Sequence, residues 1–296
     1  MDTRFWGPSG WKMLHLITFD YIYSPTNAIV YAKFFESLPY ILPCKYCRAS
    51  LTDYYRKYPF KIHNTLNVEL DFKKWLYTIH NCVNDKLRKQ ELNPNPNPKY
   101  SDIKQFYENW QRCDWEKQLT IFWEFLFAVA YNHPKEITTH SKPIDNCPSY
   151  VYKCKDKCEK NKWNILSLSD RLYWFKRFWM FLPAVLPVEI AKKWEEIEKD
   201  NLPTLDSRRS TLAWLWRMRC KLDSKFKDPY TSICKKIATY SSNCGKNKHS
   251  ITCRRRTIKK SVQYKLRRRK TTSRNSRRRK TKKRKTKKRK TIKNTK

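Results

Sequence analysis

Two cysteines separated by two residues, Cys44 and Cys47, are the clearest chemical signal in the sequence. Such a pair can close a small disulfide, or each cysteine can serve as a metal ligand. The pair follows an apolar segment and lies where a helix is expected to begin, so the helix dipole would favour a thiolate there. Lys45 and Arg48 add positive charge beside it. The sequence therefore predicts a reactive dithiol, although this spacing alone fits either chemistry.

The elements that must position this pair are predicted to be helices. Glycine is rare, with three residues in 296, and apolar residues recur at three- and four-residue spacing. We therefore expect an all-α protein in which Pro39 ends the second helix and Asp170 caps a later one. The expected helices span residues 9–23, 27–38, 44–58, 67–89 and 101–111, followed by 115–131, 169–181, 187–199 and 205–222.

Two of these helices carry polar residues on faces that are otherwise apolar. Trp11 and His15 lie one turn apart, and His80 and Asn84 have the same spacing on the helix over 67–89. A buried polar group costs free energy unless it is hydrogen-bonded. Each pair is therefore either an internally bonded part of the core or the edge of a ligand site, and for Trp11 and His15 the residues alone favour the core.

Several motifs occur in a fixed order around the cysteine pair and cover residues 1–113. They are Trp6-Gly7-Pro8 with Trp11 and Leu14-His15, the Cys44/Cys47 pair, and Trp75-Leu76 with His80-Asn81, Val83-Asn84, Leu87 and Lys89. This ordered set resembles the Erv/ALR family of FAD-linked sulfhydryl oxidases. The resemblance implies a four-helix bundle, with a short fifth helix, that holds FAD with a redox-active disulfide against the isoalloxazine.

The resemblance also implies a reaction and a role for each matching residue. Two thiols would be oxidised to a disulfide while O2 is reduced to H2O2. Cys44 would exchange with incoming protein thiols, and Cys47 would lie against the flavin and make a charge-transfer contact when reduced. The residues implied to bind FAD are Gly7, Trp11, His15, Cys47, His80, Asn81, Val83, Asn84, Leu87, Lys89 and Tyr107.

The sequence departs from the family pattern at two places. Many relatives have a structural disulfide where this chain has Tyr77 and Tyr100. Because both cysteines are absent together, we expect aromatic packing in place of the bridge. Arg88 stands where the family usually has glycine between Leu87 and Lys89, which bears on the fit near the FAD diphosphate.

The second region, residues 114–253, is predicted to be a helical domain and matches no family from its sequence. It contains Cys154 and Cys158, a CxxxC pair with Cys147 nearby. Family members often use an additional cysteine pair to carry electrons from the substrate to the bundle, so this pair could be such a shuttle. It could also be a structural or metal-ligating pair, or two separate thiols.

The last segment, residues 254–296, contains 25 of the 66 Lys and Arg residues and no Asp or Glu. It has too little apolar content to form a core, and we expect it to be disordered. A chain of this charge will bind nucleic acid or another polyanion without sequence preference. The segment could serve as an anchor on nucleic acid or on a larger particle such as a virion, or it could be a solvated tail with incidental affinity.

The remaining expectations concern location, partners and a competing function. The N-terminus has no apolar signal region, and the most apolar stretch, residues 119–131, is too short to span a bilayer and contains Glu124, so we expect neither secretion nor a membrane span. By analogy with the family we expect a homodimer. The alternative is a zinc-stabilised nucleic-acid-binding protein with Cys44, Cys47, His63 and either Cys82 or His80 as ligands, whereas the oxidase requires no metal.

Overall fold

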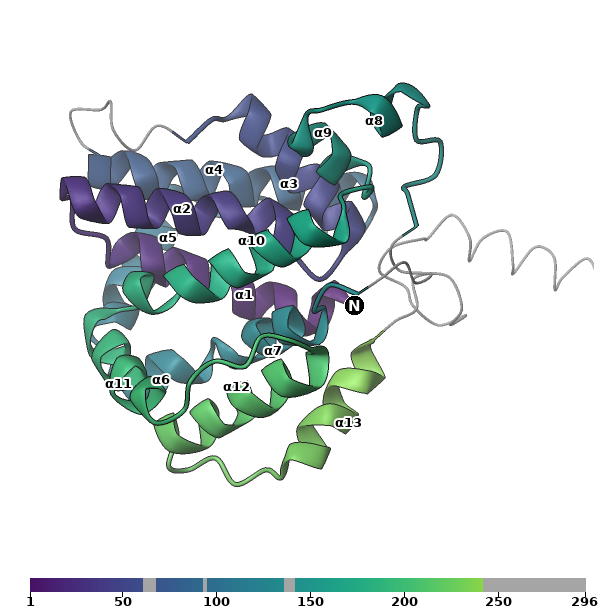
Figure 1. Ribbon diagram of the computed structural model, residues 1–296. Helices are drawn as coiled ribbons and strands as arrows, with labels where there is room; N and C mark the ends of the chain where they lie inside the picture. Colours follow the sequence, from purple (N-terminus) through teal and green to yellow (C-terminus); the bar gives the residue numbers. More distant parts are fainter. Residues whose placement is uncertain (61–67, 93–94, 136–141, 242–296) are drawn as a thin grey trace, which may run out of the picture. The chain divides into compact units, whose positions relative to one another are not determined.

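The computed structural model describes residues 1–60, 68–92, 95–135 and 142–241, and these residues contain helices and no strand (Figure 1). The prediction of an all-α chain is confirmed. The basic segment 254–296 lies outside the described residues, and so do Cys244 and Cys253. In the part of the chain that is described, no helix is long and apolar enough to cross a membrane.

The first five helices form the predicted bundle with its short fifth helix. Local signals set where three of them begin: the Asp2 side chain caps the first, Ser24 caps the second, and Cys44 occupies the N-cap of the third. The helices are α1 (Thr3–Phe19), α2 (Pro25–Ile41), α3 (Lys45–Lys57), α4 (Val68–Lys89) and α5 (Tyr100–Gln111).

Helix α2 continues through Pro39, so the prediction that this proline ends the helix is wrong. Proline has no N–H and leaves the carbonyl four residues earlier without its helical partner. Here that carbonyl belongs to Phe35, and the Tyr55 hydroxyl of α3 donates to it at 3.3 Å. Because the orphaned carbonyl is satisfied, the helix extends to Ile41 and ends three residues before Cys44.

The described residues of the second region form eight α-helices and one 3-10 helix. Helix α10 is capped by the side chain of Ser167 instead of Asp170, whose N–H donates to that cap. The elements are α6 (Trp115–Thr120), α7 (Trp123–Tyr131), α8 (Tyr150–Lys153), α9 (Lys157–Lys162), α10 (Leu168–Phe181), η2 (Pro183–Val185), α11 (Val188–Lys199), α12 (Arg208–Leu222) and α13 (Tyr230–Tyr240).

The single helix expected over 115–131 is divided into α6 and α7, and a side chain from the bundle explains the division. The Ser9 hydroxyl of α1 donates to the Ile121 carbonyl at 2.5 Å and accepts the Phe125 N–H at 3.1 Å. Ser9 thereby satisfies backbone groups on both sides of the break. The second region is thus hydrogen-bonded directly to the first helix.

The two regions share one apolar core. Helix α10 packs along α2, and α7 packs against α1 (Figure 1). Phe178 of α10 lies 5.3 Å from the ring of Phe34 and 6.2 Å from that of Phe125, and all three side chains are fully buried. A Cβ on Gly10 would come within 3.0 Å of Phe125, so glycine allows this close approach of α1 and α7.

Candidate active site

Cys44 and Cys47 lie at the start of α3, as the sequence predicted. The Cys44 carbonyl accepts the N–H groups of Cys47 and Arg48, both at 3.0 Å, which closes the first helical turn around the pair. Cys47 is partly buried, whereas Cys44 is only 3% exposed. The residue before Cys44 is held by a hydrogen bond from the Met1 nitrogen to the Pro43 carbonyl at 3.2 Å.

The environment of the pair differs from the thiolate-favouring one expected from the helix start. A hydrogen bond with Cys44 and burial raise the pKa of Cys47 well above its usual value. The positive charges of Lys86 and Arg48 act in the opposite direction and are outweighed. With both sulfurs reduced and close together, one proton shared between them favours a thiol at Cys47.

Four of the predicted FAD-binding residues form one aromatic cluster contributed by α1, α4 and α5. The Trp11 and His80 rings stack with their centroids 4.0 Å apart and an interplanar angle of 8°. His15 Nε2 lies 3.1 Å from His80 Nδ1, and the His15 ring stacks on Tyr107 at 4.9 Å. The bundle therefore joins Trp11 and Tyr107, which are 96 positions apart in the sequence, into one cluster through the two histidines.

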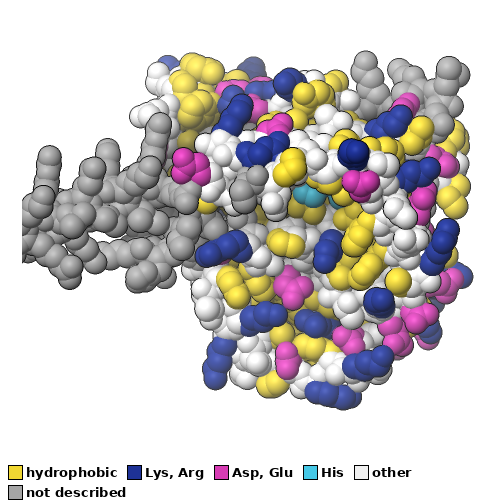
Figure 2. All heavy atoms as spheres, turned by 180° about the vertical axis from the view of Figure 1, so that it is seen from behind, with side chains coloured by type: hydrophobic (Ala, Val, Ile, Leu, Met, Phe, Trp, Pro, Cys, Tyr) yellow, Lys and Arg dark blue, Asp and Glu magenta, His cyan; other side chains and the backbone are white. Residues whose placement is uncertain are grey.

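This cluster fits a planar heteroaromatic group such as a part of FAD. His15 is 1% exposed, and its Nδ1 atom is buried without a hydrogen-bond partner among the described residues. Such an atom costs free energy unless a ligand or water satisfies it. His80 is partly exposed beside it. The face behind that of Figure 1 exposes hydrophobic side chains between charged ones (Figure 2). Flat rings next to an unsatisfied nitrogen favour the ligand-site interpretation of Trp11 and His15 over the purely structural one.

Both histidines are held neutral, and this predicts acid sensitivity. Burial lowers the pKa of His80 to about 4, and burial together with the His80 charge lowers the pKa of His15 well below its usual value. An unfolded histidine titrates near 6.5, so the unfolded chain binds more protons as the pH falls from about 6.5 to about 4. The free energy of unfolding of FAD-free protein should therefore decrease across this window by about 3 kcal/mol for His80 alone, and the contribution of His80 should then level off.

Urea unfolding at several pH values measures this effect, with His80→Phe as the comparison. The variant removes one titrating ring, so its stability should depend less steeply on pH between 6.5 and 4. An equal pH dependence in both proteins would show that His80 does not titrate in this way.

The other predicted cofactor residues lie on α1 and along the C-terminal half of α4. Gly7, Asn81, Val83, Asn84 and Leu87 are partly buried, and Lys89 is exposed. Arg88, which replaces the family glycine, is ion-paired with Asp85 and donates to the Asn95 carbonyl at 3.0 Å. It thus fastens the Asn-Pro linker to α4.

The expected aromatic replacement of the family disulfide is present. Tyr77 of α4 and Tyr100 of α5 meet edge to face with ring centroids 5.4 Å apart. The Tyr77 hydroxyl also donates to the Pro98 carbonyl at 2.7 Å. These contacts join α4, the linker and α5 at the place where relatives are implied to carry the bridge.

Two cationic residues act on the cysteine pair, of which the sequence indicated Arg48 and did not indicate Lys86. Lys86 donates to Ser50 Oγ at 2.5 Å and acts on the pKa of Cys47. Arg48 is buried and hydrogen-bonded to the segment before Cys44. The position of Arg48 directly after the pair was a usable signal, whereas nothing in the spacing of Lys86 distinguishes it from a surface lysine.

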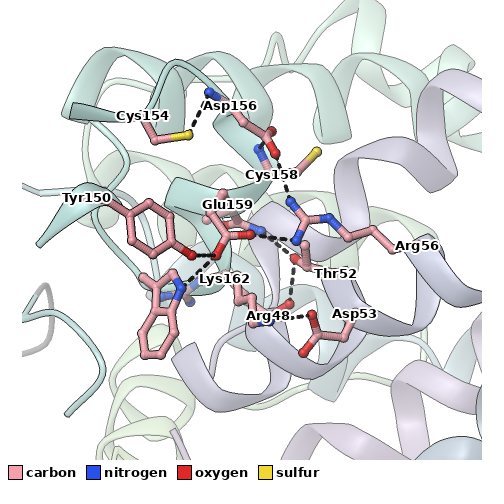
Figure 3. Close-up of polar contacts among 12 residues, drawn as sticks. Arg48, Thr52, Asp53, Arg56, Tyr150, Cys154, Asp156, Cys158, Glu159 and Lys162 are labelled. Carbon is pink, nitrogen blue, oxygen red and sulfur yellow. Dashed lines mark hydrogen bonds and ion pairs between the residues drawn. The ribbon is translucent and has the colours of Figure 1, made fainter. Parts of the chain in front are cut away.

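The CxxxC pair spans a break between two helices, so its two cysteines do not lie on one helical turn. Cys154 ends α8, and Cys158 is in the first turn of α9 (Figure 3). Asp156 lies between them: its N–H donates to Cys154 Sγ at 3.3 Å, and its carboxylate accepts the Cys158 N–H at 2.8 Å. Cys158 is exposed, and its Sγ lies 3.2 Å from the hydroxyl of Tyr40 on α2.

Ion pairs attach helix α9 to helix α3 (Figure 3). Arg56 pairs with Asp156 at 2.9 Å and with Glu159 at 2.6 Å, and Lys162 pairs with Asp53 at 3.0 Å. The CxxxC pair is therefore fixed to the same helix that begins with the CxxC pair.

The ligand cluster that the zinc alternative requires is absent from the part of the chain that is described. No group of three or more His, Cys, Asp or Glu residues with metal-binding geometry occurs there. His63, one of the ligands in that hypothesis, lies outside the described residues.

Comparisons with known proteins match part of the chain, and the family model covers the bundle. The family model described as "Erv1 / Alr family" matches residues 8–111. A "Probable FAD-linked sulfhydryl oxidase R368" of Acanthamoeba polyphaga mimivirus is 36% identical over 86 residues, which cover 28% of this chain and 59% of that protein. An FAD-linked sulfhydryl oxidase of African swine fever virus (isolate Pig/Kenya/KEN-50/1950) is 33% identical over 105 residues, which cover 35% of this chain and 80% of the viral protein.

A second African swine fever virus protein of the same name, from isolate Warthog/Namibia/Wart80/1980, is 31% identical over 109 residues and is also covered to 80%. No solved structure matches the chain. The mimivirus match supports the family resemblance over 28% of the chain. Since the family model matches residues 8–111 and two relatives that are 33% and 31% identical are covered to 80% of their length, the chain belongs to the Erv1/Alr family.

Proposed function

We propose that this protein is an FAD-linked sulfhydryl oxidase that makes disulfides in thiol substrates through Cys44 and Cys47 and passes the electrons to O2, giving H2O2. The observation that carries the proposal is the cluster of Trp11, His15 and His80, with its unsatisfied buried nitrogen, in the same helical bundle as a cysteine pair. The relatives that match this bundle are named for the same activity.

The chain's own residues account for the thiol half of the reaction. A substrate thiolate attacks Cys44 of the disulfide, a bond forms between the two sulfurs, and Cys47 leaves with the electron pair. A second substrate thiolate attacks the substrate sulfur of this mixed disulfide, the substrate leaves as a disulfide, and Cys44 is released as a thiolate. Bound FAD would supply the two-electron acceptor that returns the pair to its disulfide and the means to reduce O2. Trp11, His15, His80 and Tyr107 would hold it.

Access to Cys44 is restricted by the second region. The Lys45 ammonium group donates to the Lys142 and Pro143 carbonyls at 3.2 and 3.1 Å, so this segment lies over the start of α3. A folded substrate cannot place a thiol directly on a sulfur that is 3% exposed. An exposed cysteine nearby would relieve this restriction, and Cys158 is exposed and touches Tyr40, four residues before Cys44. Cys154 and Cys158 are therefore proposed to relay electrons from protein thiols.

Changing Cys154 and Cys158 together to alanine should slow the oxidation of a reduced protein at least tenfold and leave the oxidation of a small dithiol within twofold. A small dithiol can reach Cys44 without the relay, whereas a folded protein cannot. Oxygen uptake with each substrate measures the two rates. The matched control is the double change of Cys220 and Cys234 to alanine, which removes two partly buried cysteines elsewhere. Equal losses on both substrates, or no loss on either, would argue against a relay.

The proposal as a whole is tested by purifying the protein, recording its visible spectrum and following O2 consumption with a dithiol. A yellow protein that consumes O2 and produces H2O2 is expected. A folded, colourless protein that cannot be reconstituted with FAD, and that loses its fold to a chelator, would instead favour the zinc-stabilised protein.

Partners and location extend the proposal. The substrates would be protein thiols, and the working unit would be a homodimer like that expected for the family. The basic segment 254–296 would bind nucleic acid or another polyanion through its charge. With viral relatives of this kind, the place of action would be the host cytoplasm at the viral factory, and the protein would also enter the virion.

A further inference from the structure

Arg48 connects the cysteine pair to the second region through a buried guanidinium group. Its Nη1 donates to the Leu42 carbonyl at 2.7 Å, and its Nη2 donates to Asn164 Oδ1 at 2.6 Å. Leu42 lies two residues before Cys44, and Asn164 follows α9, 116 residues after Arg48 in the chain. The guanidinium group therefore holds the cysteine loop and the second region at the same time.

Asn164 is built to hold this position. Its φ of 61° is in the left-handed region, which asparagine tolerates better than most residues, and its side chain is buried. Its Nδ2 donates to the Lys142 carbonyl at 2.8 Å, and the same carbonyl accepts from Lys45. A continuous set of hydrogen bonds thus runs from Leu42 through Arg48 and Asn164 to Lys142 and back to Lys45, and it encloses the Cys44 loop.

Arg48 lies in the first turn of α3, directly after Cys47 in the sequence. The charged groups that act on its pKa are Cys44, Arg171 and Cys47, and burial is the largest cause that lowers this pKa to about 10. Arg48 also lines a small cavity whose described lining contains no acidic residue: Tyr40, Ile41, Asn132, Pro134, Arg171 and Phe175. A buried cation is expensive unless a negative charge compensates it. A thiolate at Cys44 or Cys47 is the group in this environment that can supply that charge.

We propose that Arg48, oriented by Asn164, is a positioning residue that provides the counter-charge for the thiolate of Cys44. The proposal rests on the function proposed above and assigns the second region a part in it. In the resolving step, the bond between Cys44 Sγ and the substrate sulfur breaks and the electron pair remains on Cys44 Sγ. The fixed positive charge stabilises that leaving thiolate, while the second substrate thiolate forms the new bond in the released disulfide.

The test is the pH dependence of Cys44 alkylation in the full-length, FAD-loaded protein, reduced by excess dithiol without oxygen. Iodoacetamide labelling is quantified on the peptide that contains Cys44. The midpoint of the profile reports the thiol pKa, and the plateau reports access, so a change in packing alone is recognised. Lys86 from α4, Arg171 from α10 and Lys45 also face this site, and all three are kept in every variant.

Arg48→Met should move the midpoint up by about one pH unit, a tenfold loss of thiolate at a given pH. Arg48→Lys, which retains the charge, should leave the midpoint within about 0.3 unit of wild type, and Asn164→Ala should give an intermediate shift. An unchanged midpoint in Arg48→Met, or an equal shift in Arg48→Lys, would overturn the proposal.

If Arg48→Met does not fold, Asn164→Ala decides, since an unchanged midpoint in that variant would also overturn it. Labelling does not require turnover, so the two proposals fail separately. A protein without oxidase activity that shows the expected shifts contradicts the proposed function alone. An active oxidase without the shifts contradicts the role of Arg48 alone.

Discussion

Cys47→Ser is expected to abolish thiol oxidation while FAD remains bound. A serine hydroxyl cannot form the disulfide with Cys44, so the pair can no longer take two electrons from a substrate. We expect the rate of O2 uptake to fall by roughly 10³-fold or more, as when a covalent catalytic group is removed. FAD should be retained because the proposed binding residues Trp11, His15 and His80 are unchanged, and serine is close to cysteine in size.

The measurement combines oxygen uptake with the visible spectrum and the flavin content of the purified variant. Cys113→Ser is a suitable control, since it changes a partly buried cysteine that follows α5. It should retain both colour and activity. Full activity of Cys47→Ser would refute the assignment of the pair, and loss of both colour and activity would show that Cys47 is needed to hold the cofactor.

Phe178→Ala is expected to destabilise the bundle and the second region together. The side chain is fully buried and contacts the rings of Phe34 from α2 and Phe125 from α7. Truncating such a phenylalanine costs about 3–5 kcal/mol, because the transfer free energy is lost and a cavity remains. That is a large share of a typical domain stability of about 5–15 kcal/mol.

Thermal unfolding followed by tryptophan fluorescence and by flavin release should show one transition, shifted down by the same amount with both signals. Met180→Ala on the same helix is the control, since its side chain is 69% exposed and its loss should cost less than about 0.5 kcal/mol. Two separate transitions, with only one of them shifted, would show that residues 114–241 unfold independently of the bundle.

The bundle could be predicted from the sequence because its signals are local and ordered. The cysteine pair at the start of α3, the paired Trp11 and His15, and the helix that carries His80 are all defined by spacing within a few residues. The family resemblance placed these pieces in one fold. It also led to the expectation that Tyr77 and Tyr100 would meet.

What the sequence could not reveal depends on contacts between distant segments. The burial of Cys44 and the bonds of Arg48 require a loop that lies about a hundred residues later in the chain. The break between α6 and α7 requires a serine from α1, and the continuation of α2 through Pro39 requires a tyrosine from α3. No local pattern contains the partner in these cases, so propensity alone predicts the wrong helix end.

The ring contact between Tyr77 and Tyr100 has a consequence for where such an enzyme can operate. A scaffold bridged by sulfur would itself be open to attack by the thiols that the enzyme consumes. Here α4 and α5 are joined by aromatic rings and a hydroxyl, neither of which glutathione can cleave. Thiols in the surroundings therefore cannot break this junction, and α4 and α5 stay joined in a reducing medium.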